Sequence, residues 1–450
     1  MPSNKKRYGE SFAGAVTGAN KIPIVYTVMC VDYLHAGHMN IIKESRKLGK
    51  LIVGILTDEA VASYKRIPMC PYEQRADVVS NIEGVWKVVP QHTLDYTDNL
   101  RKFKPDIVTN ADDWREGRQK ETRKQVIAVL KEWSGELIEI PYTKGISSTK
   151  IIESIGKEGT TPERRMSSLR RAINCKELVR VLEAHNGLSG LIVQNSKFED
   201  REFDAIWISS LTDSTSKGKP DIELVDFTSR IQTVNEILEV TTKPIIIDGD
   251  TGGQTEHFTY MVKTLERLGV SAVIIEDKVF PKVNSLIPGA KHKQETIEKF
   301  CDKIKAGKSA QVTEDFMIIA RIESFIAGKG LTDALLRADA YIDAGADAIM
   351  IHSKETSAHQ IVEFAKEYNE FGNRVPLVIV PTTYYAMKEK EMKYYKVDVV
   401  IYANHQIRAA YEAMREVAES ILMYECCDVG DMCCFVKELI ELTKKSIITV

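Results

Sequence analysis

The chain has 450 residues, of which 44% are hydrophobic and 28% are charged, and this is the composition of an ordinary globular protein. Its length is about three times the ~150 residues typical of one domain, so two or three domains are expected. The formal net charge of -3 gives no field that would attract nucleic acid or an anionic membrane. The N-terminal stretch has neither a membrane-length apolar run nor the apolar core of a signal peptide, so we expect a cytoplasmic protein.

The eight cysteines are too sparse for a disulfide framework in a chain of this length, and we interpret them as reduced thiols. Four of them cluster near the C-terminus as Cys426, Cys427, Cys433 and Cys434. Their spacing lacks the C-x-x-C loop typical of structural zinc sites. We therefore expect these thiols to pack against other side chains rather than to bind a metal.

Residues 1–21 are polar and without strand or helix periodicity, which predicts a flexible N-terminus. Over residues 22–152, strand-like apolar runs then alternate with helix-length stretches, the pattern of a small α/β domain with a parallel sheet. The expected strands are Ile24–Met29, Leu51–Leu56, Val85–Val89, Ile107–Thr109 and Glu136–Ile140, and the expected helices are Met39–Lys47, Tyr72–Ile82 and Glu121–Trp133.

A linker is expected over residues 153–167, because the sequence there is charged and contains Gly, Thr and Pro. Residues 168–450 contain eight further short apolar runs, which fits a (β/α)8 barrel followed by C-terminal helices. The expected barrel strands are Leu188–Val193, Ala205–Ile208, Pro244–Ile247, Ala272–Ile275, Phe316–Ala320, Ala348–Ile351, Leu377–Val380 and Val399–Ile401.

Most of these runs are followed directly by charged or hydrogen-bonding residues. A single carboxylate after one strand is often a helix cap or part of a surface turn, but polar groups after most strands of a barrel converge on one mouth. This pattern predicts an active site at the carboxyl ends of the strands. The residues concerned are Asp248, Asp250, Glu276, Arg321, Glu323, His352, Ser353, Thr382 and Asn404.

In the N-terminal domain, the segment CVDYLHAGHMNIIKES places His35 and His38 on either side of a tight turn before a helix. Two imidazoles and the free N–H groups of a helix N-terminus suit a phosphate chain. Two histidines in a loop are a weak signal alone, but four more segments follow in order. They are TDEAV at 57–61, PYEQR at 71–75, NADDW at 110–114 and GISSTKI at 145–151.

With these segments the domain resembles the cytidylyltransferase family that includes the glycerol-3-phosphate and phosphocholine enzymes. The resemblance implies a Rossmann-like nucleotidyltransferase fold, CTP as co-substrate and Mg²⁺, with His35 and His38 as catalytic residues that stabilise charge on the nucleotide phosphates. The implied nucleotide-binding residues are Asp32, His35, His38, Asp112, Ser147, Ser148 and Thr149.

This chain departs from the family pattern at two places. Met29, Cys30 and Val31 replace residues that include the family's small Gly-containing pair, which alters the backbone approach to phosphate. Tyr142 stands where the glycerol-phosphate enzymes carry Arg, and this predicts a different acceptor.

The sharpest motif of the C-terminal region is EDKVFPKVNSL at 276–286, accompanied by EAHNGLS, DGDTGG, ARIESFIAGKG, IHSKE and YANHQIRA. With these motifs the region resembles phosphoenolpyruvate mutase of the isocitrate lyase superfamily. The catalytic residues that the resemblance implies are Asp221, Lys282, Asn284, Arg321 and His352, and the implied substrate-binding residues are Trp207, Ser209, Leu211, Ser285, Leu286 and Ser353. A loop that carries Lys282 to Leu286 is expected to close over the site and exclude water.

Asp248, Asp250 and Glu276 offer hard oxygen ligands, which predict a Mg²⁺ site rather than a zinc site. The lyase branch of the superfamily uses a cysteine on its gating loop, and residues 276–290 contain none. Carbon–carbon lyase chemistry is therefore disfavoured.

The preferred hypothesis is a two-headed enzyme similar to the fused proteins of phosphonate antibiotic pathways such as that of fosfomycin. Its barrel would interconvert phosphoenolpyruvate and phosphonopyruvate, and its N-terminal domain would transfer CMP from CTP to a phosphonate such as 2-hydroxyethylphosphonate. A homo-oligomer, a dimer or a tetramer formed through the barrel, is expected. Two alternatives stay open, namely a barrel that hydrolyses phosphonopyruvate and an N-terminal domain that binds nucleotide or docks without catalysis.

Overall fold

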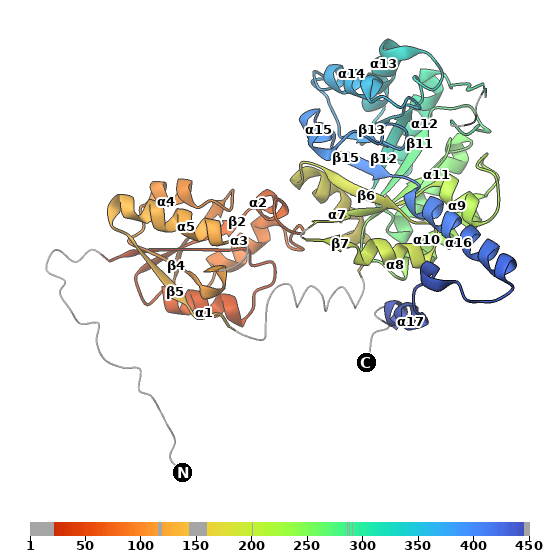
Figure 1. Ribbon diagram of the computed structural model, residues 1–450. Coiled ribbons are helices and arrows are strands. Elements are labelled where there is room, and N and C mark those ends of the chain that lie inside the picture. Colours follow the sequence, from red (N-terminus) through yellow and green to blue (C-terminus); the bar gives the residue numbers. More distant parts are fainter. Residues whose placement is uncertain are drawn as a thin grey trace. The chain divides into compact units, whose positions relative to one another are not determined.

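The computed structural model describes residues 22–115, 119–143, 160–199, 201–285, 287, 289 and 291–444 (Figure 1). The chain divides into two compact units, one comprising Met1–Ala60 and Met69–Ser148 and the other Val61–Pro68 and Thr149–Val450. The expected flexible terminus, residues 1–21, and residues 153–159 of the expected linker lie outside the described residues.

The first unit is built on a five-stranded parallel sheet with the strand order β3-β2-β1-β4-β5. The strand order reverses beside β1, and such a switch point leaves an open crevice at the carboxyl end of the central strand. The strands are β1 (Ile24–Met29), β2 (Lys50–Leu56), β3 (Val85–Gln91), β4 (Ile107–Ala111) and β5 (Glu136–Ile140). The helices are α1 (Ala36–Ser45), α2 (Asp58–Ala62), α3 (Tyr72–Ser80), α4 (Thr97–Phe103) and α5 (Gln119–Leu130), with the short 3-10 turns η1 (Asp112–Arg115) and η2 (Lys131–Trp133).

All five strands predicted for this unit are confirmed, but α1 begins at Ala36 rather than at Met39. The earlier start has a local cause, because the side chain of His35 caps the helix by accepting a hydrogen bond from the N–H of Gly37. One face of the sheet packs Val53 and Ile55 against Ile42 of α1 and Val79 of α3. Helix α1 is thereby fixed over the switch point.

The second unit contains a closed barrel of eight parallel strands, in the order β10-β11-β12-β13-β14-β15-β6-β9. This confirms the predicted (β/α)8 fold. The barrel strands are β6 (Val179–Glu183), β9 (Ala205–Ile208), β10 (Ile245–Asp248), β11 (Ala272–Glu276), β12 (Met317–Ile322), β13 (Ala348–Ile351), β14 (Leu377–Ile379) and β15 (Val399–Tyr402), and β7 (Lys197–Phe198) and β8 (Arg201–Glu202) form a separate hairpin.

Helix α7 (Pro162–Cys175) precedes the barrel and begins inside the stretch predicted as a linker, because Thr161 caps it and a proline occupies its first turn. The other helices of this unit follow the strands. They are α8 (Gly187–Asn195), α9 (Ser210–Ser216), α10 (Phe227–Leu238), α11 (Thr255–Leu268), α12 (Ile297–Ala310), α13 (Gly330–Asp343), α14 (His359–Tyr368), α15 (Glu389–Tyr394), α16 (His405–Tyr424) and α17 (Val436–Lys444), with the 3-10 turn η3 (Gly430–Met432).

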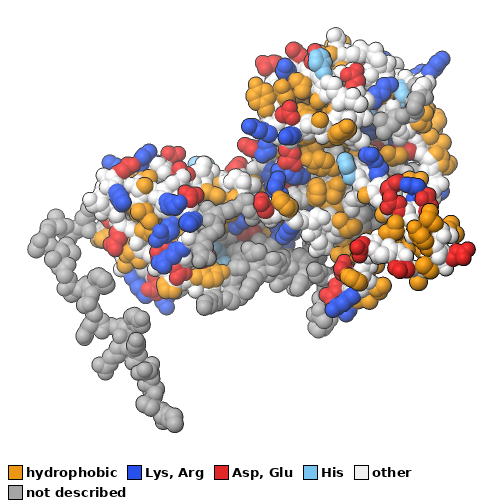
Figure 2. All heavy atoms as spheres, viewed as in Figure 1, with side chains coloured by type: hydrophobic (Ala, Val, Ile, Leu, Met, Phe, Trp, Pro, Cys, Tyr) orange, Lys and Arg blue, Asp and Glu red, His pale blue; other side chains and the backbone are white. Residues whose placement is uncertain are grey.

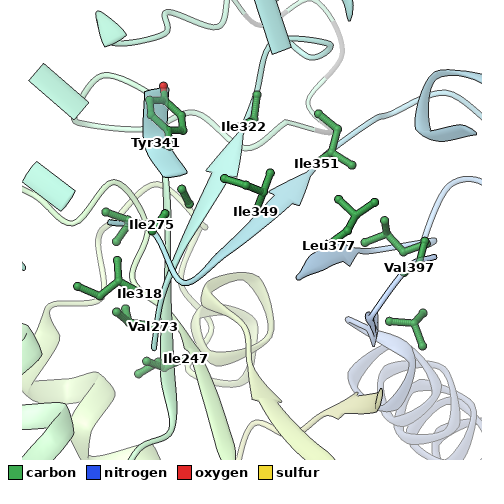
Figure 3. Close-up of a cluster of buried hydrophobic side chains, with 14 of the residues drawn as sticks. Ile247, Val273, Ile275, Ile318, Ile322, Tyr341, Ile349, Ile351, Leu377 and Val397 are labelled. Carbon is green, nitrogen blue, oxygen red and sulfur yellow. The ribbon is translucent and has the colours of Figure 1, made fainter. Parts of the chain in front are cut away.

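Alternate residues of each barrel strand face opposite sides, which produces two hydrophobic layers. The inner layer fills the barrel with side chains such as Ile246, Ile274 and Ile319. The outer layer packs their neighbours against the surrounding helices, and Figure 3 shows part of it, including Ile275 and Ile349. At the carboxyl end of each strand, the next inward position after this layer must therefore point into the mouth of the barrel.

One of the eight predicted barrel strands is wrong. The run Leu188–Val193 lies in helix α8, and the first barrel strand is β6, which was not predicted. A short apolar run does not by itself distinguish a strand from a buried helix. The helix is favoured here by Asn186, whose side chain forms a capping box with Ser189.

The predicted packing of the four clustered cysteines is also wrong, because all four are exposed between α16 and α17. No group of three or more His, Cys, Asp or Glu side chains in the described parts of the chain is arranged to hold a metal ion. Among the helices that the structure describes, none combines the length and the apolar character needed to cross a membrane.

Candidate active sites

The mouth of the barrel collects polar side chains because the inward positions of its strands recur at every second residue. In each of three strands the inward position two residues after a core isoleucine carries a charged side chain. The pairs are Ile246 and Asp248 in β10, Ile274 and Glu276 in β11, and Ile319 and Arg321 in β12. The strand pairs are parallel and in register, with Asp248 beside Ile274 and Glu276 beside Arg321. The alternation that builds the core thus brings these groups to one end.

These side chains line a cavity of about 80 Å³. Fourteen of the predicted residues line it, together with six that were not predicted. The predicted ones are Trp207, Ser209, Leu211, Asp221, Asp248, Glu276, Lys282, Asn284, Ser285, Arg321, His352, Ser353, Thr382 and Asn404, and the others are Ser210, Lys278, Met350, Val380, Thr383 and Ala403. Predicted residue Asp250 lies beside this lining, and Leu286 lies outside the described residues.

Lys282 brings positive charge into the acidic part of this pocket. Its Nζ lies 2.5 Å from Oδ1 of Asp250, 3.1 Å from Oδ1 of Asp221 and 2.7 Å from Oγ of Ser210. Burial would lower the pKa of Lys282, but the surrounding carboxylates outweigh it and raise this pKa well above its usual value. Lys282 is therefore a charged ammonium at the centre of the site.

Asp250 receives a second cation from α10. Arg230 is buried and donates to Oδ2 of Asp250 at 2.7 Å and to the backbone oxygen of Asp248 at 2.5 Å. Burial would raise the pKa of Asp250, but the charges of Arg230 and Lys282 hold it at about 2. Asp250 thus stays ionised throughout the physiological pH range.

On the other side of the pocket, Arg321, Glu323 and His352 form a compact group. Arg321 donates through Nε to Oε1 of Glu323 at 2.5 Å, and its outer nitrogen lies 3.3 Å from Oε2 of Glu276. Nδ1 of His352 lies 2.8 Å from Oε1 of Glu323 and 2.9 Å from Arg321. Burial lowers the pKa of His352, which favours the neutral imidazole beside the permanently charged guanidinium. Such a pair can hold the oxygens of a phosphoryl group.

The segment 278–285, which we call the closing loop, is attached to the barrel at both ends. Lys278 Nζ lies 3.1 Å from Oε2 of Glu323 and donates to Oγ of Ser285 at 2.6 Å and to the backbone oxygen of Val283 at 3.2 Å. Asn284 donates through Nδ2 to Oδ2 of Asp221 at 2.6 Å. The loop therefore lies over the pocket with its polar side chains directed inward.

The acidic residues fit Mg²⁺ better than a softer metal, because their ligand atoms are carboxylate oxygens. Oε1 of Glu276 is buried and makes no hydrogen bond, and burial raises the pKa of this group to about 7. Oδ2 of Asp248 already accepts hydrogen bonds from the backbone N–H and the hydroxyl of Ser210. Among the described residues, Asp248, Asp250 and Glu276 do not form a ready three-ligand cluster, so they suit only an ion that keeps several of its waters, and their role as metal residues stays a prediction.

The N-terminal site lies at the carboxyl end of β1, where the strand order reverses. The rings of His35 and His38 lie together there, with centroids 3.9 Å apart, at the start of α1. Burial lowers the pKa of His35. The structure therefore brings the two predicted histidines and a helix N-terminus to one point, as a phosphate site requires.

The other predicted residues of this site are tied to neighbouring backbone. Asp32 accepts a hydrogen bond from the N–H of Cys70 at 3.1 Å, and Asp112 accepts one from the N–H of Tyr142 at 2.9 Å. Tyr142, which marks the predicted change of acceptor, is exposed. Ser147, Ser148 and Thr149 lie outside the described residues.

The turn after β1 is held by a buried arginine to which the sequence interpretation gave no role. Arg75 donates to the backbone oxygens of Cys30 and Cys70 at 2.5 and 2.9 Å, and to Oδ1 of Asp58 at 2.6 Å. This turn includes Val31 at φ +54°, a conformation that is costly for a β-branched residue. Arg75 therefore stabilises the strained turn that leads to His35.

Comparisons with known proteins match each of the two parts of the chain to a family. Residues 169–422, more than half of the chain, match the family model of phosphoenolpyruvate phosphomutase. The chain belongs to this family. Residues 27–154 match the cytidylyltransferase-like family model, so the N-terminal part is a cytidylyltransferase-like domain.

Three similar proteins illustrate the range of the relatives. The phosphoenolpyruvate phosphomutase of Tetrahymena pyriformis is 40% identical over 259 residues, which cover 57% of this chain and 84% of that protein. The phosphonopyruvate hydrolase of Variovorax sp. (strain Pal2) is 38% identical over 252 residues, covering 56% of this chain and 84% of the relative. A crystal structure of phosphonopyruvate hydrolase with oxalate and Mg²⁺ superposes with a TM-score of 0.57 at 35% identity, covering 62% of this chain and 95% of that one.

Several residues that shape the two sites were not predicted. Ser210 and Arg230 act through hydrogen bonds to predicted residues or to their backbone, and a buried partner of this kind has no spacing rule in the sequence. Arg75 is the last residue of the PYEQR segment, so its place in that motif could have identified it. Lys278 is part of the EDK motif, so its position in the matched loop could have identified it.

We expect Arg75→Met to lower the free energy of unfolding of the first unit by about 3 kcal/mol, because it removes a buried cation beside the carboxylate of Asp58 and the donor to the backbone oxygens of Cys30 and Cys70. Arg101→Met is the matched control, since Arg101 also pairs with a carboxylate but is 57% exposed, and it should leave the unfolding midpoint almost unchanged. Urea unfolding followed by tryptophan fluorescence measures both, because three of the four tryptophans lie in this unit. Equal midpoints for the two variants would contradict the proposed role of Arg75.

Proposed function

We propose that the barrel interconverts phosphoenolpyruvate and phosphonopyruvate and that the N-terminal domain transfers CMP from CTP to a phosphonate. The observation that carries the first part is the closing loop, whose Lys282 and Asn284 reach Asp221 in the pocket that Arg321 and His352 also line. Carboxylates that would hold a metal ion, together with the cations Lys282 and Arg321, suit a substrate with a carboxylate at one end and a phosphoryl group at the other.

The conversion of phosphonopyruvate to phosphoenolpyruvate needs no net proton transfer and consumes no water. The carbon–phosphorus bond breaks, its electron pair forms the pyruvate enolate, and the enolate oxygen then attacks the phosphorus. A loose, metaphosphate-like group passes between the two ends of the enolate. Any water in the pocket would capture this group and release phosphate, so the site must hold both fragments still and keep water out.

The described residues support this sequence of events. Arg321 and His352 hold the phosphoryl oxygens, Asn284 steadies the group in transit, and Trp207, Ser209 and Leu211 line the side assigned to the substrate's carboxylate end. Asp248, Asp250 and Glu276 would hold Mg²⁺, which supplies positive charge against the enolate oxygen. Leu286 would complete the closed loop.

We expect the intact protein with Mg²⁺ to convert phosphonopyruvate to phosphoenolpyruvate, and ³¹P NMR measures this conversion. Asp248→Ala should abolish this conversion while CTP-dependent pyrophosphate release continues, because it removes a metal-site carboxylate from one domain only. Asp302→Ala is the matched control, since this carboxylate is exposed on α12. Pyruvate and phosphate as the main products would establish the hydrolase alternative that the Variovorax relative favours, and loss of both activities in a folded Asp248→Ala protein would contradict separate sites.

In the N-terminal domain, the acceptor's oxyanion attacks the α-phosphorus of CTP and pyrophosphate leaves. Negative charge develops on the phosphate oxygens, and the paired imidazoles with the N–H groups of α1 stabilise it. Ser147, Ser148 and Thr149 would hold the triphosphate, and Asp32 and Asp112 would complete the nucleotide site. No protein nucleophile is needed for this chemistry.

Replacing His38 with Ala should slow pyrophosphate release by a factor on the order of 10², the usual effect of removing one preorganised donor to a transition state. His92→Ala provides the control, because His92 is an exposed histidine of the same unit. A coupled pyrophosphate assay with CTP measures both, and the mutase activity should not change. Nucleotide binding without turnover in the wild-type protein would instead support the non-catalytic alternative.

The phosphonate acceptor is inferred from the fusion and from Tyr142, which replaces an arginine and suits a smaller or less anionic acceptor. We expect 2-hydroxyethylphosphonate to be the best acceptor and 2-aminoethylphosphonate the second. Glycerol 3-phosphate and phosphocholine should be at least ~10-fold poorer in kcat/KM, which corresponds to about 1.4 kcal/mol. Pyrophosphate release with the four compounds decides the matter, and a clear preference for either phosphate ester would refute the assignment.

We further infer that the protein is a homo-oligomer formed through the barrel. Helix α16, which follows the last barrel strand, buries none of its residues and exposes Tyr411, Met414 and Leu422. Figure 2 shows hydrophobic side chains on this C-terminal segment, beside acidic ones. The other helices that follow barrel strands bury part of their surface in the same unit. A second copy of the chain would cover the apolar face of α16 in the same way.

Light scattering after size exclusion should therefore give the mass of a dimer or a tetramer. The double variant Met414→Glu, Leu422→Glu should shift the mass toward the monomer, because it places charges in the proposed interface. Exchanging the exposed residue Glu416 for Gln should have no effect. A monomeric wild-type protein would refute the inference.

A further inference from the structure

A glutamate that does not line the pocket joins the closing loop to the turn that carries Asp250. Glu223 lies in the loop between α9 and α10, two residues after Asp221. Its Oε2 accepts a hydrogen bond from the backbone N–H of Lys282 at 2.9 Å. Its Oε1 accepts two from Thr251, one from the backbone N–H at 3.0 Å and one from the hydroxyl at 2.7 Å.

The turn that Glu223 holds is conformationally demanding. Asp250 has a φ of +53° and Gly252 and Gly253 have φ values of +74° and +63°. A non-glycine residue pays for such a conformation, so the surrounding contacts must hold the turn in place. Lys303 of α12 donates to the backbone oxygens of Thr251 and Gly253 at 2.6 and 2.7 Å. Glu223 holds the same turn by accepting hydrogen bonds from the N–H and the hydroxyl of Thr251.

Glu223 itself has a φ of +58°, which is also unfavourable for a residue with a side chain. The segment 219–223 supplies two separate contacts to the closing loop. Asp221 receives the side chains of Lys282 and Asn284, whereas Glu223 receives the backbone of Lys282. Lys282 is thus fixed at its backbone by Glu223 and at its ammonium by Asp250 and Asp221.

We propose that Glu223 is a positioning residue that couples closure of the 278–285 loop to the conformation of the turn carrying Asp250. One carboxylate joins the two segments, so the loop can take its closed position only when the turn presents Thr251 and Asp250 correctly. The coupling sets the position of Lys282 through its backbone N–H, and Glu223 itself does not line the pocket. Its activity readout rests on the mutase function proposed above, and its protease readout does not.

The first test measures the loop directly by limited trypsin digestion, with mass spectrometry to quantify cleavage after Lys278 and Lys282. Glu223→Ala should raise cleavage at these two sites about tenfold over wild type, because losing hydrogen bonds to a charged acceptor shifts the closing equilibrium by about that factor. Mg²⁺ with oxalate, used as the ligand probe, should protect the wild-type loop more than the variant loop. Glu236→Ala is the control, since Glu236 is exposed on α10.

Two further variants separate coupling from general destabilisation. Glu223→Gln keeps one oxygen acceptor and should give an intermediate cleavage rate. Thr251→Val removes one hydroxyl donor on the far side of the glutamate and should raise cleavage of the loop although it does not touch the loop. The proposal would be overturned if the loop of Glu223→Ala were cleaved no faster than that of Glu236→Ala, or if cleavage rose equally at sites throughout the chain. Unchanged loop cleavage in Thr251→Val would also overturn it.

The second test uses phosphonopyruvate and ³¹P NMR. Glu223→Ala should lower kcat more than it changes KM, and it should divert part of the turnover to pyruvate and phosphate as water enters the loosened site. A proportionate loss of activity with no diverted product would contradict the coupling. If the wild-type protein does not turn over phosphonopyruvate, the proposed function fails, whereas the protease test still decides the role of Glu223.

Discussion

Burying several carboxylates around one pocket is the constraint on which the barrel's active site depends. An unpaired charge in a protein interior costs several kcal/mol, so each carboxylate needs a cation or hydrogen-bond donors. Arg230 and Lys282 supply charge to Asp250, and Arg321 and Lys278 supply it to Glu323. These cations come from a helix, a strand and a loop, so the buried negative charges are compensated only when all three elements are assembled. A site built in this way depends on the completed fold, and two of its compensating cations, Lys278 and Lys282, lie on the loop that closes over it.

The closed parallel barrel solves the geometric part of the problem. Its two-residue alternation fills the interior with apolar side chains and then delivers the next inward residue of each strand to the mouth. Asp248, Glu276 and Arg321 are positioned by this rule alone. The first unit reaches a comparable result by another route, because the strand order reverses beside β1 and His35 and His38 lie together after the carboxyl end of that strand. In both units the backbone topology fixes where the reactive groups meet.

Much of this arrangement could be predicted from the sequence, since strand-end residues and the EDK and HxGH segments carry strong local signals. Seven of the eight predicted barrel strands and all five strands of the first sheet overlap strands of the structure. The exception, Leu188–Val193, had the composition of a strand, and only the capping contact of Asn186 distinguishes it as a helix. Arg230 and Glu223 were beyond prediction for a different reason. Each acts through partners 18 or more residues away, and no periodicity connects such positions.

The same structural details bear on the difference between a mutase and a hydrolase. Both reactions break the carbon–phosphorus bond and differ in which nucleophile then captures the phosphoryl group, the enolate oxygen or water. The fold and the acidic residues serve either outcome, so they cannot decide between them. The choice between the two reactions depends on two times. One is how long water is kept from the pocket, and the other is how long the phosphoryl group takes to move between the two ends of the enolate. We therefore expect control over the outcome to lie in the attachment of the closing loop, through Lys278, Asn284 and Glu223, rather than in the groups that break the bond.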